Sequence, residues 1–355
     1  MNQMGTEDFY IGTYSKKLGA MEANGEGIYL CGLNLDTGAF SRAACVATCD
    51  NPSYLAWGPD RSHIYATKEV LAADSPALLA YTRSGDGTLT ALNQVPVDGE
   101  LPCHLSVDPS GHYLASAQYL SGSATLFRVL ADGSIGDCLD IIQHQGSGPD
   151  GRRQQGPHAH FAGFLKSPPA LAVVDLGLDR VFAYPFDAST GKLERSNPEV
   201  GIITPGAGPR HIVATSGGNT IYVFSEMSAC IFQFERDGKH WQEKAVTQVL
   251  DAPNGGGAAL HLVGDGRYLY VSERSESRIF GFSIEAETGG LRATNSVASG
   301  GDGPRDFGVS KDGRFLVVAN QHSNTLTSFF RDPKNGALRD TGHKIEIGSP
   351  VSVLF

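Results

Sequence analysis

Short runs of apolar or alternating residues follow one another along the whole chain, and turn-forming residues separate them. The stretch after residue 101 shows the pattern, with runs at His104–Val107, Tyr113–Ala117, Ala124–Val129 and Cys138–Ile142. The turn Asp108–Gly111 separates the first two runs, and similar turns recur at residues 58–61, 264–267 and 311–314. Short runs bounded by Asp, Pro, Ser and Gly are typical of β-strands. We therefore predict an all-β fold.

A short phrase recurs seven times: an acidic or polar residue, then glycine, then usually an apolar residue two positions later. Its glycines stand at positions 38, 87, 133, 191, 238, 289 and 336, so the intervals are 49, 46, 58, 47, 51 and 47 residues. The fifth copy, in which Lys239 and His240 precede Trp241, is the weakest. A period of this size holds one four-stranded sheet, and such sheets arranged radially form a β-propeller. We predict seven blades in a single domain over residues 1–355, because no blade buries its faces alone.

The two ends of the chain complete one blade between them. The chain begins with strand patterns at Phe9–Thr13, Ile28–Leu33 and Phe40–Ala47, and it ends with one at Val351–Phe355. Six blades are complete in sequence, and the last strand can join the first three to make the seventh. This pairing closes the ring and removes exposed sheet edges.

The chain is rich in glycine (44 residues), has 19% charged residues, and carries a formal net charge of −10. Many short strands joined by tight turns account for the glycine. The negative charge disfavours binding to nucleic acid or to an anionic membrane, since both need basic surface. A site for an anionic ligand would therefore be a local cluster of arginine or histidine.

The cysteines and the N-terminus favour the cytoplasm. Six cysteines, at positions 31, 45, 49, 103, 138 and 230, include no C-x-x-C pair, so we expect reduced and mostly buried thiols. Residues Met1–Asp8 have no basic start and no apolar run, and no stretch approaches the roughly 18 apolar residues of a membrane span. We expect a cytoplasmic protein that is a monomer or a weak homo-oligomer.

Two sets of loops carry the polar residues that point to function. In a propeller, the loop entering the first strand of a blade and the loop after its second strand lie at the same channel mouth. Proline in the entry loops fixes φ and stiffens strand entry, but it does not explain the residues that follow. In the four most polar entry loops these residues are His104, His158, Arg210 and Arg305. We expect at least three of them to share a pocket; the alternative is that some pair with backbone carbonyls or carboxylates.

The longest interval contains a glycine-rich loop, residues 146–160, with Arg152 and Arg153 and with His158 and His160 at its end. This loop can fold over the channel mouth, or it can be a solvated surface loop. Alternation along a strand would put the two histidine rings on opposite faces. We therefore expect His158 at the rim and His160 as its buried support. No metal site is expected, because no tight ligand spacing such as H-E-x-x-H occurs and the arginines would oppose a cation.

Several phrases together resemble the seven-bladed propeller lactonase family, which includes bacterial 6-phosphogluconolactonases and shares its fold with fungal carboxymuconate cyclases. The resemblance runs from Phe9 to the C-terminus. It is carried by residues 146–149, 153–154 and 157–160, by 205–211, by 303–307 and by 312–320. The resemblance implies a cytosolic enzyme with no organic cofactor and a site at the channel mouth.

The family's proposed catalytic His, Arg, Glu and second Arg match His158, Arg210, Glu226 and Arg305. Two positions depart from the family pattern: Glu273 precedes Arg274, and Gln118 stands where family members usually have Asn. An acid at position 273 could pair with Arg274. The remaining residues that we expect to bind substrate are His104, Arg153, His160, His211, Arg274 and Gln321.

Opening a lactone needs a polarised carbonyl, an activated water and a proton for the leaving alkoxide. Arg210 and Arg305 can stabilise oxyanion charge and hold carboxylate or hydroxyl groups. His158 or Glu226 can act as general base. No G-x-S-x-G elbow is present, so a serine nucleophile is not supported. Arginines 152, 153 and 274 are candidates for holding a phosphate.

The favoured function is hydrolysis of 6-phosphogluconolactone, a small anionic sugar lactone, in the pentose phosphate pathway. A lactonase for another sugar acid or a carboxymuconate-type cycloisomerase is the alternative. A third hypothesis is a non-enzymatic protein-binding propeller, which predicts a rim of exposed aromatic and apolar residues. The rim is instead rich in His, Arg and Glu, which favours a small anionic ligand.

Overall fold

The computed structural model describes residues 5–19, 21–238, 240–250, 255–263 and 266–355. Lys239 of the fifth repeated phrase, Gly264 and Asp265 of a recurring turn, and residues 1–4 lie outside the described residues. In the described part, the strands form seven sheets, with one short 3₁₀ helix, η1 (Ala72–Asp74). This arrangement confirms the all-β class and the seven blades.

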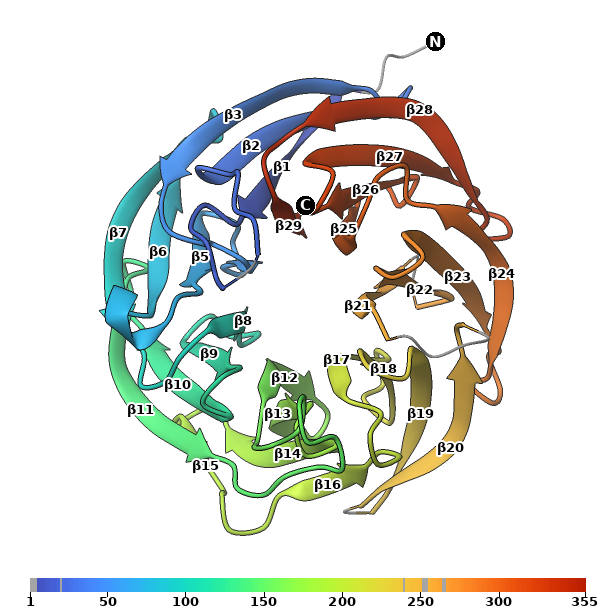
Figure 1. Cartoon of the computed structure of the whole chain (residues 1–355). Coiled ribbons are helices and arrows are strands. Elements are labelled where there is room, and N and C mark those ends of the chain that lie inside the picture. The colour runs from blue at the N-terminus through green and yellow to red at the C-terminus, as the bar shows by residue number, and fades with distance from the viewer. Residues whose placement is uncertain (1–4, 20, 239, 251–254, 264–265) are drawn as a thin grey trace. The chain divides into compact units, whose positions relative to one another are not determined.

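The chain divides into two compact units. The first unit comprises Met1–Leu55, Ser84–Leu89 and Ala258–Phe355 and contains three four-stranded sheets (Figure 1). The first sheet has the order β29 (Pro350–Leu354), β1 (Thr6–Thr13), β2 (Gly27–Asn34), β3 (Phe40–Thr48). The second is β21 (Gly257–Val263), β22 (Tyr268–Glu273), β23 (Arg278–Ile284), β24 (Leu291–Ala298). The third is β25 (Pro304–Val309), β26 (Phe315–Asn320), β27 (Thr325–Arg331), β28 (Leu338–Glu346).

The second unit comprises Ala56–Arg83 and Thr90–Gly257 and contains the other four sheets. Two of them are β4 (Leu55–Trp57), β5 (His63–Lys68), β6 (Ala77–Arg83), β7 (Leu89–Pro96), and β8 (Pro102–Val107), β9 (Tyr113–Gln118), β10 (Ser123–Val129), β11 (Ile135–Gln143). The next is β12 (Ala159–Lys166), β13 (Pro169–Asp175), β14 (Arg180–Asp187), β15 (Lys192–Leu193), with β16 (Glu199–Ile202) also paired to β14. The last is β17 (Pro209–Ala214), β18 (Thr220–Ser225), β19 (Cys230–Asp237), β20 (His240–Gln248). The expectation of a single domain over residues 1–355 stays a prediction.

The C-terminal strand completes the first sheet, as the sequence predicts. Strand β29 pairs with β1, and Tyr10 lies opposite Leu354. The main-chain N–H of Val353 also donates to Asp306 Oδ2 at 2.8 Å, which ties β29 to strand β25 in the same unit. The two ends of the chain are therefore joined by backbone pairing.

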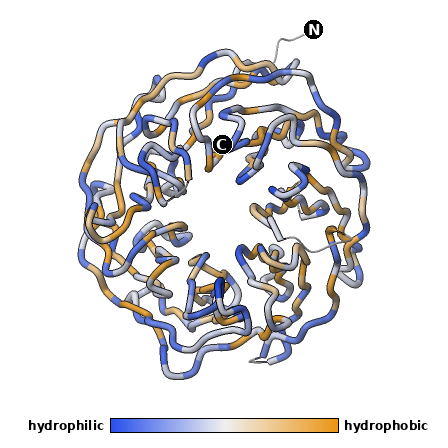
Figure 2. Tube along the Cα trace, in the orientation of Figure 1, coloured by the Kyte–Doolittle hydropathy of each residue, from blue (hydrophilic) through white to orange (hydrophobic). Residues whose placement is uncertain are grey.

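The hydrophobic core lies between neighbouring sheets of each unit. In the second unit, Leu126 of one sheet belongs to the same buried cluster as Leu171 and Tyr184 of the next. In the first unit, Tyr270 packs with Phe307 in the same way. The second strands of the sheets are buried on both faces, whereas the fourth strands alternate between half-buried and exposed residues. Figure 2 shows hydrophobic and hydrophilic residues interleaved along the strands of both units.

The repeated phrase is the turn between the third and fourth strands of a sheet, and it packs against the neighbouring sheet. Gly133 has a φ of 83°, and its carbonyl accepts a hydrogen bond from the buried Tyr65 Oη at 2.9 Å. A Cβ at this position would overlap the His63 ring. Asp132 closes the turn by accepting from the Ser134 hydroxyl at 2.6 Å, and these hydrogen bonds hold the pKa of Asp132 below its usual range. The phrase therefore recurs where a turn packs against the neighbouring sheet. A Cβ would come within 3 Å of that sheet also at Gly38, Gly87, Gly191 and Gly336, whereas at Gly238 no atom lies within 4 Å.

All six cysteines are free thiols, of which only Cys31 and Cys103 are buried and Cys138 is exposed. The expectation of mostly buried thiols is therefore wrong. Burial raises the pKa of Cys31 to about 12, so that thiol is unreactive at neutral pH. Across the described ranges, none of the helical structure is long and apolar enough to span a bilayer.

Candidate active site

In five sheets, the strand that begins the blade starts with a β-bulge. Its first residue pairs with the last residue of the neighbouring strand, and the residue after it has no partner across the sheet. Bulges of this kind re-aim a side chain and are common beside active sites. The extra residues are Cys103, His160 and Arg210 in the second unit, and Arg305 and Val351 in the first.

The bulges change the expected correspondence between the entry loops. Ala159 and Pro209 hold the same register position in their sheets, so the next residues, His160 and Arg210, correspond to each other. His158 lies before strand β12. An alignment by the prolines instead matches His158 to Arg210, two positions too early, because strand pairing and not the proline sets the register.

The rings of His158 and His160 both contact Tyr119. The His158 ring stacks on the Tyr119 ring at 4.6 Å between centroids, and the His160 ring meets it edge-on at 5.4 Å. The predicted placement of the two histidines on opposite faces is therefore wrong, because the bulge interrupts the alternation of strand β12. Both histidines are buried.

Glu226, the first residue after strand β18, lies at the centre of a charged group that we call the Glu226 cluster: Arg153, His160, Arg210 and Glu226. Glu226 Oε1 lies 2.6 Å from Arg153 Nη2, and Oε2 lies 3.3 Å from Arg210 Nε. His160 Nε2 is 3.9 Å from Oε2. Arg210 and Glu226 are buried, whereas the Arg153 side chain is 42% exposed. Both oxygens of the carboxylate thus face an arginine.

Arg153 links the cluster to the long loop. It also donates to Tyr119 Oη at 3.3 Å. Burial lowers the pKa of Arg153, but the Glu226 carboxylate and the Tyr119 hydroxyl more than offset this and leave its pKa above the usual value. Burial raises the pKa of Tyr119, which keeps the phenol protonated at neutral pH. At neutral pH, Arg153 therefore stays a cation beside the neutral hydroxyl group of Tyr119.

His104 and His211 pack against the cluster. Ring centroids are 5.5 Å apart between His104 and His211, and 5.7 Å apart between His211 and His160, with edge-to-face geometry in both cases. His104 Nδ1 accepts a main-chain N–H of strand β12 at 3.3 Å, so the proton of its neutral ring lies on Nε2. Arg210 Nη1 lies 3.1 Å from His211 Nε2. These two histidines fix the orientation of Arg210 and His160.

A buried chain of hydrogen bonds holds His158 in place. Its Nδ1 lies 3.0 Å from the carbonyl oxygen of Tyr119, which can only accept, so Nδ1 donates and the neutral ring carries its lone pair on Nε2. The main-chain N–H of His158 donates to Asp175 Oδ1 at 2.8 Å. Asp175 Oδ2 lies 2.6 Å from His144 Nδ1, and His144 Nε2 lies 3.0 Å from Tyr184 Oη.

His144 and Tyr184 are not among the residues predicted from sequence. His144 is the first residue of the loop that enters strand β12, ahead of the glycine-rich stretch 146–160, and Tyr184 lies within strand β14. They reach Asp175 only because strands that are separate in sequence pair and pack, and the sequence pattern carries no signal for that contact. Asp175 itself ends strand β13 and is fully buried.

The first unit holds the remaining predicted residues. Arg305, at its bulge, donates from Nη2 to Tyr14 Oη at 2.9 Å, and its guanidinium carbon lies 5.2 Å from the Tyr14 ring centroid. Gln321, the first residue after strand β26, is buried, and Arg274, the first after β22, is half-buried. Arg274 and Gln321 thus hold the position in their sheets that Glu226 holds in the second unit.

The two departures from the family pattern have structural roles. The carboxylate of Glu273 accepts from the main chain and hydroxyl of Ser275 and from the main chain of Glu276, and within the described ranges it does not pair with Arg274. The Gln118 amide donates to two hydroxyls in its own sheet and accepts from a third. Neither residue competes with a ligand for an arginine.

No group of three or more His, Cys, Asp or Glu side chains in the described part of the chain has an arrangement that would hold a metal ion. The carboxylate of the Glu226 cluster faces arginines instead. The arrangement suits an anionic or carbonyl-containing ligand, since guanidinium groups bind carboxylate and phosphate oxygens and stabilise oxyanions.

Known proteins are similar to this chain over nearly its whole length. Residues 8–355 match the family described as "Lactonase, 7-bladed beta-propeller". The protein named 6-phosphogluconolactonase of Bacillus subtilis (strain 168) is 32% identical over 351 residues, which cover 98% of this chain and 97% of that one. The 6-phosphogluconolactonase of Formosa agariphila is 26% identical, with coverage of 97% and 98%. The solved structure of the periplasmic gluconolactonase of Pseudomonas aeruginosa has a TM-score of 0.90 at 29% identity, and 98% of this chain is covered.

Proposed function

Because the chain belongs to the seven-bladed β-propeller lactonase family and is a lactone hydrolase, we propose that it hydrolyses 6-phosphogluconolactone to 6-phosphogluconate at the Glu226 cluster. The observation that supports this site best is the buried carboxylate with an arginine at each oxygen. The names of the Bacillus and Formosa relatives support the phosphorylated substrate. In this proposal the protein acts in the cytoplasm, without a cofactor, on a small anionic sugar lactone.

Arg210 is the electrophilic residue in this proposal. Its guanidinium group is buried and oriented by Glu226 and His211, so its remaining N–H groups are fixed before substrate binds. A preorganised donor of this kind stabilises developing oxyanion charge by roughly 3 kcal/mol. Arg305 holds the corresponding bulge position in a sheet of the first unit.

His158 is the general base in this proposal. Its Nδ1 proton is directed to the Tyr119 carbonyl, so Nε2 can accept a proton from the attacking water and return it to the ring alkoxide that leaves. Glu226 is unsuited to that role because both of its oxygens face arginines. Glu226 instead orients Arg153 and Arg210.

Arginines 152 and 153 are assigned to the substrate phosphate. Both lie in the long loop, in a turn whose two main-chain N–H groups donate to Asp150 at 2.8 and 3.0 Å. Arg152 is exposed and Arg153 is 42% exposed, so both can reach a solvent-facing group. Arginine suits this task because its planar donors match phosphate oxygens in pairs.

The test compares freshly generated 6-phosphogluconolactone with gluconolactone, with the spontaneous rate subtracted and with chelator added in a parallel run. We expect faster hydrolysis of the phosphorylated lactone, no effect of chelator, and loss of the preference when Arg152 and Arg153 are both changed to Gln. Equal or faster turnover of gluconolactone would favour the second candidate, a gluconolactonase, which the likeness to the Pseudomonas enzyme supports. Turnover of neither lactone would overturn the proposal.

A further inference from the structure

A cationic cavity lies in the first unit, at the ends of strands β21, β25 and β27. It has a volume of about 490 Å³, within the range of small-molecule sites. The turn of residues 310–313 forms one wall, and residues 262–263 form another. Strand β25 carries Arg305 at its start and Val309 at its end, so the cavity is separated from Arg305 by the length of a six-residue strand. The cavity is therefore distinct from the bulge position that Arg305 occupies.

Arg331 forms the buried cationic wall of this cavity. The residue is only 3% exposed, its Nε donates to the Gly313 carbonyl at 2.8 Å, and its guanidinium carbon lies 5.2 Å from the Tyr268 ring centroid. Its Nη1 is buried and has no hydrogen-bond partner among the residues that the structure describes. A buried charged donor without a hydrogen-bond partner is unfavourable.

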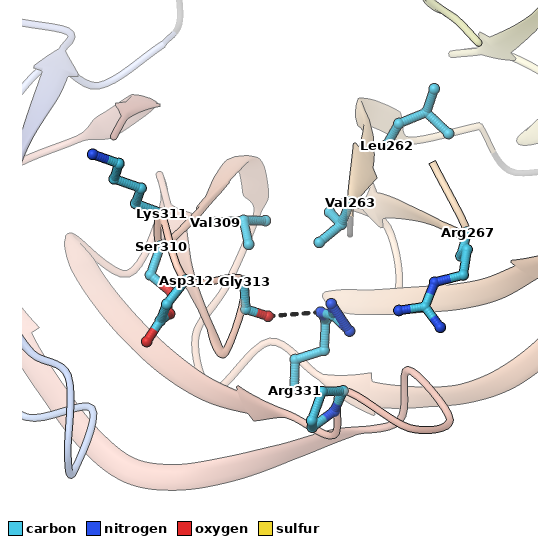
Figure 3. Close-up of a pocket in the computed structure, with 10 residues that line it drawn as sticks. Leu262, Val263, Arg267, Val309, Ser310, Lys311, Asp312, Gly313 and Arg331 are labelled. Atoms are coloured by element: carbon cyan, nitrogen blue, oxygen red, sulfur yellow. Dashed lines mark hydrogen bonds between the residues drawn. The ribbon is translucent and has the colours of Figure 1, made fainter. Parts of the chain in front are cut away.

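The described lining of the cavity carries charge of the opposite sign to that of the whole chain. Arg267 and Lys311 are exposed cationic side chains on its wall, and Figure 3 shows Arg267 extending toward Arg331. Asp312 is the one acidic residue among the described lining residues, and its carboxylate is 2.7 Å from both Arg314 Nε and the Ser310 hydroxyl. The described lining thus has three cations and one carboxylate that is already paired, in a chain of net charge −10.

We propose that this cavity binds the dianionic phosphate group of a small molecule. A phosphate monoester carries nearly two negative charges at neutral pH, which balances the excess of cations, and its oxygens match the fork of a guanidinium group. Arg331 and Arg267 hold the phosphate, and Lys311 adds a mobile third charge. The apolar side chains of Val263 and Val309 also line the cavity and contact the organic part of the ligand.

The test is calorimetric titration with inorganic phosphate and with phenyl phosphate at constant ionic strength. The background is the full chain with Arg152 and Arg153 changed to Gln, which removes the arginines assigned to the substrate phosphate. We expect binding to persist in this background and to weaken about tenfold in Arg331→Lys, which keeps the charge but loses the paired donors. Arg267→Gln, an exposed change that leaves the fold intact, should weaken binding severalfold and leave lactone hydrolysis unchanged.

Arg292→Gln is the matched control, because Arg292 is an exposed arginine of the same unit that pairs with Glu285. It should bind phosphate like the unchanged protein. Tighter binding of phenyl phosphate than of inorganic phosphate would identify a phosphate ester as the ligand, and equal binding would identify the free ion. The proposal would be overturned if the Arg152/Arg153 background did not bind phosphate. It would also be overturned if Arg267→Gln and Arg331→Lys bound phosphate as tightly as that background does, whatever the outcome for lactone hydrolysis.

Discussion

The Glu226 cluster shows how neighbours decide the role of a residue. A carboxylate in a cleft can serve as general base, but Glu226 faces an arginine at each oxygen. His158 faces a carbonyl that fixes its tautomer and leaves Nε2 as the acceptor. The same residue types therefore divide into an orienting group and a proton acceptor, because hydrogen-bond partners rather than residue type set their state.

At this scale the buried Asp175 gives the first prediction. Asp175→Asn removes the negative charge between His144 and the main chain of His158, so His158 is held less firmly. We expect kcat to fall about tenfold with little change in KM, because a misplaced base affects the chemical step more than binding. Steady-state kinetics across pH 5 to 9 measure both.

His144→Gln should also lower kcat with little change in KM, because His144 acts on His158 through Asp175. Asp187→Asn, in an exposed turn of the same sheet, is the matched control and should leave kcat unchanged. A loss of activity that only follows a loss of folded protein, as judged by the thermal midpoint, would show that Asp175 is structural and not a positioning residue.

At the scale of the element, the repeated turn joins the blades. Gly133 combines a φ of 83° with a position where a Cβ would overlap the His63 ring, and its carbonyl accepts from Tyr65. The turn at Gly336 accepts from Tyr270 Oη at 2.5 Å in the same manner. Glycine is needed at these turns both for the backbone conformation and for the close approach of the next sheet.

Gly133→Ala should therefore destabilise the protein by roughly 1–3 kcal/mol, since it adds backbone strain to a steric overlap. Gly85→Ala is the control, because no atom lies within 4 Å of the position its Cβ would take. Chemical denaturation of the two variants gives the free energies of unfolding. Equal stability of both variants would contradict the account of the repeated phrase.

Much of the fold could be predicted at this scale, and part of the site could not. Turn chemistry and apolar runs are local, so the strands and the Gly133 turn are visible in sequence. The bulge at His160 depends on pairing with strand β13, which no local pattern encodes, so the sequence alone does not align the two histidines correctly. The contact between His144 and Asp175 joins residues 31 positions apart, and it follows from packing alone.

At the scale of the whole molecule, the pairing of β29 with β1 joins the two ends of the chain. Val353 packs in the cluster that contains Phe9 and Phe315, and its main chain is bonded to Asp306. Deleting residues 351–355 should destabilise the protein by at least roughly 3 kcal/mol, from burial of Val351 and Val353 alone. The loss should appear as a shift of a single unfolding transition.

Differential scanning calorimetry of the truncated chain checks this expectation. Val246→Ala, which shortens an exposed valine on strand β20, is the control and should unfold like the unchanged protein. A truncated chain with the original midpoint would show that the closure is dispensable. Two separated transitions would show that the two compact units unfold independently.

In the proposed mechanism Glu226 orients the arginines of its cluster for lactone opening, and the steady-state turnover of Glu226→Gln tests this role. Glu235→Gln, a half-exposed glutamate of the same sheet that pairs with Lys244, is the matched control. We predict that kcat for 6-phosphogluconolactone falls at least about tenfold in Glu226→Gln, with the fold retained, and stays unchanged in Glu235→Gln. Unchanged turnover in a folded Glu226→Gln protein would contradict the account.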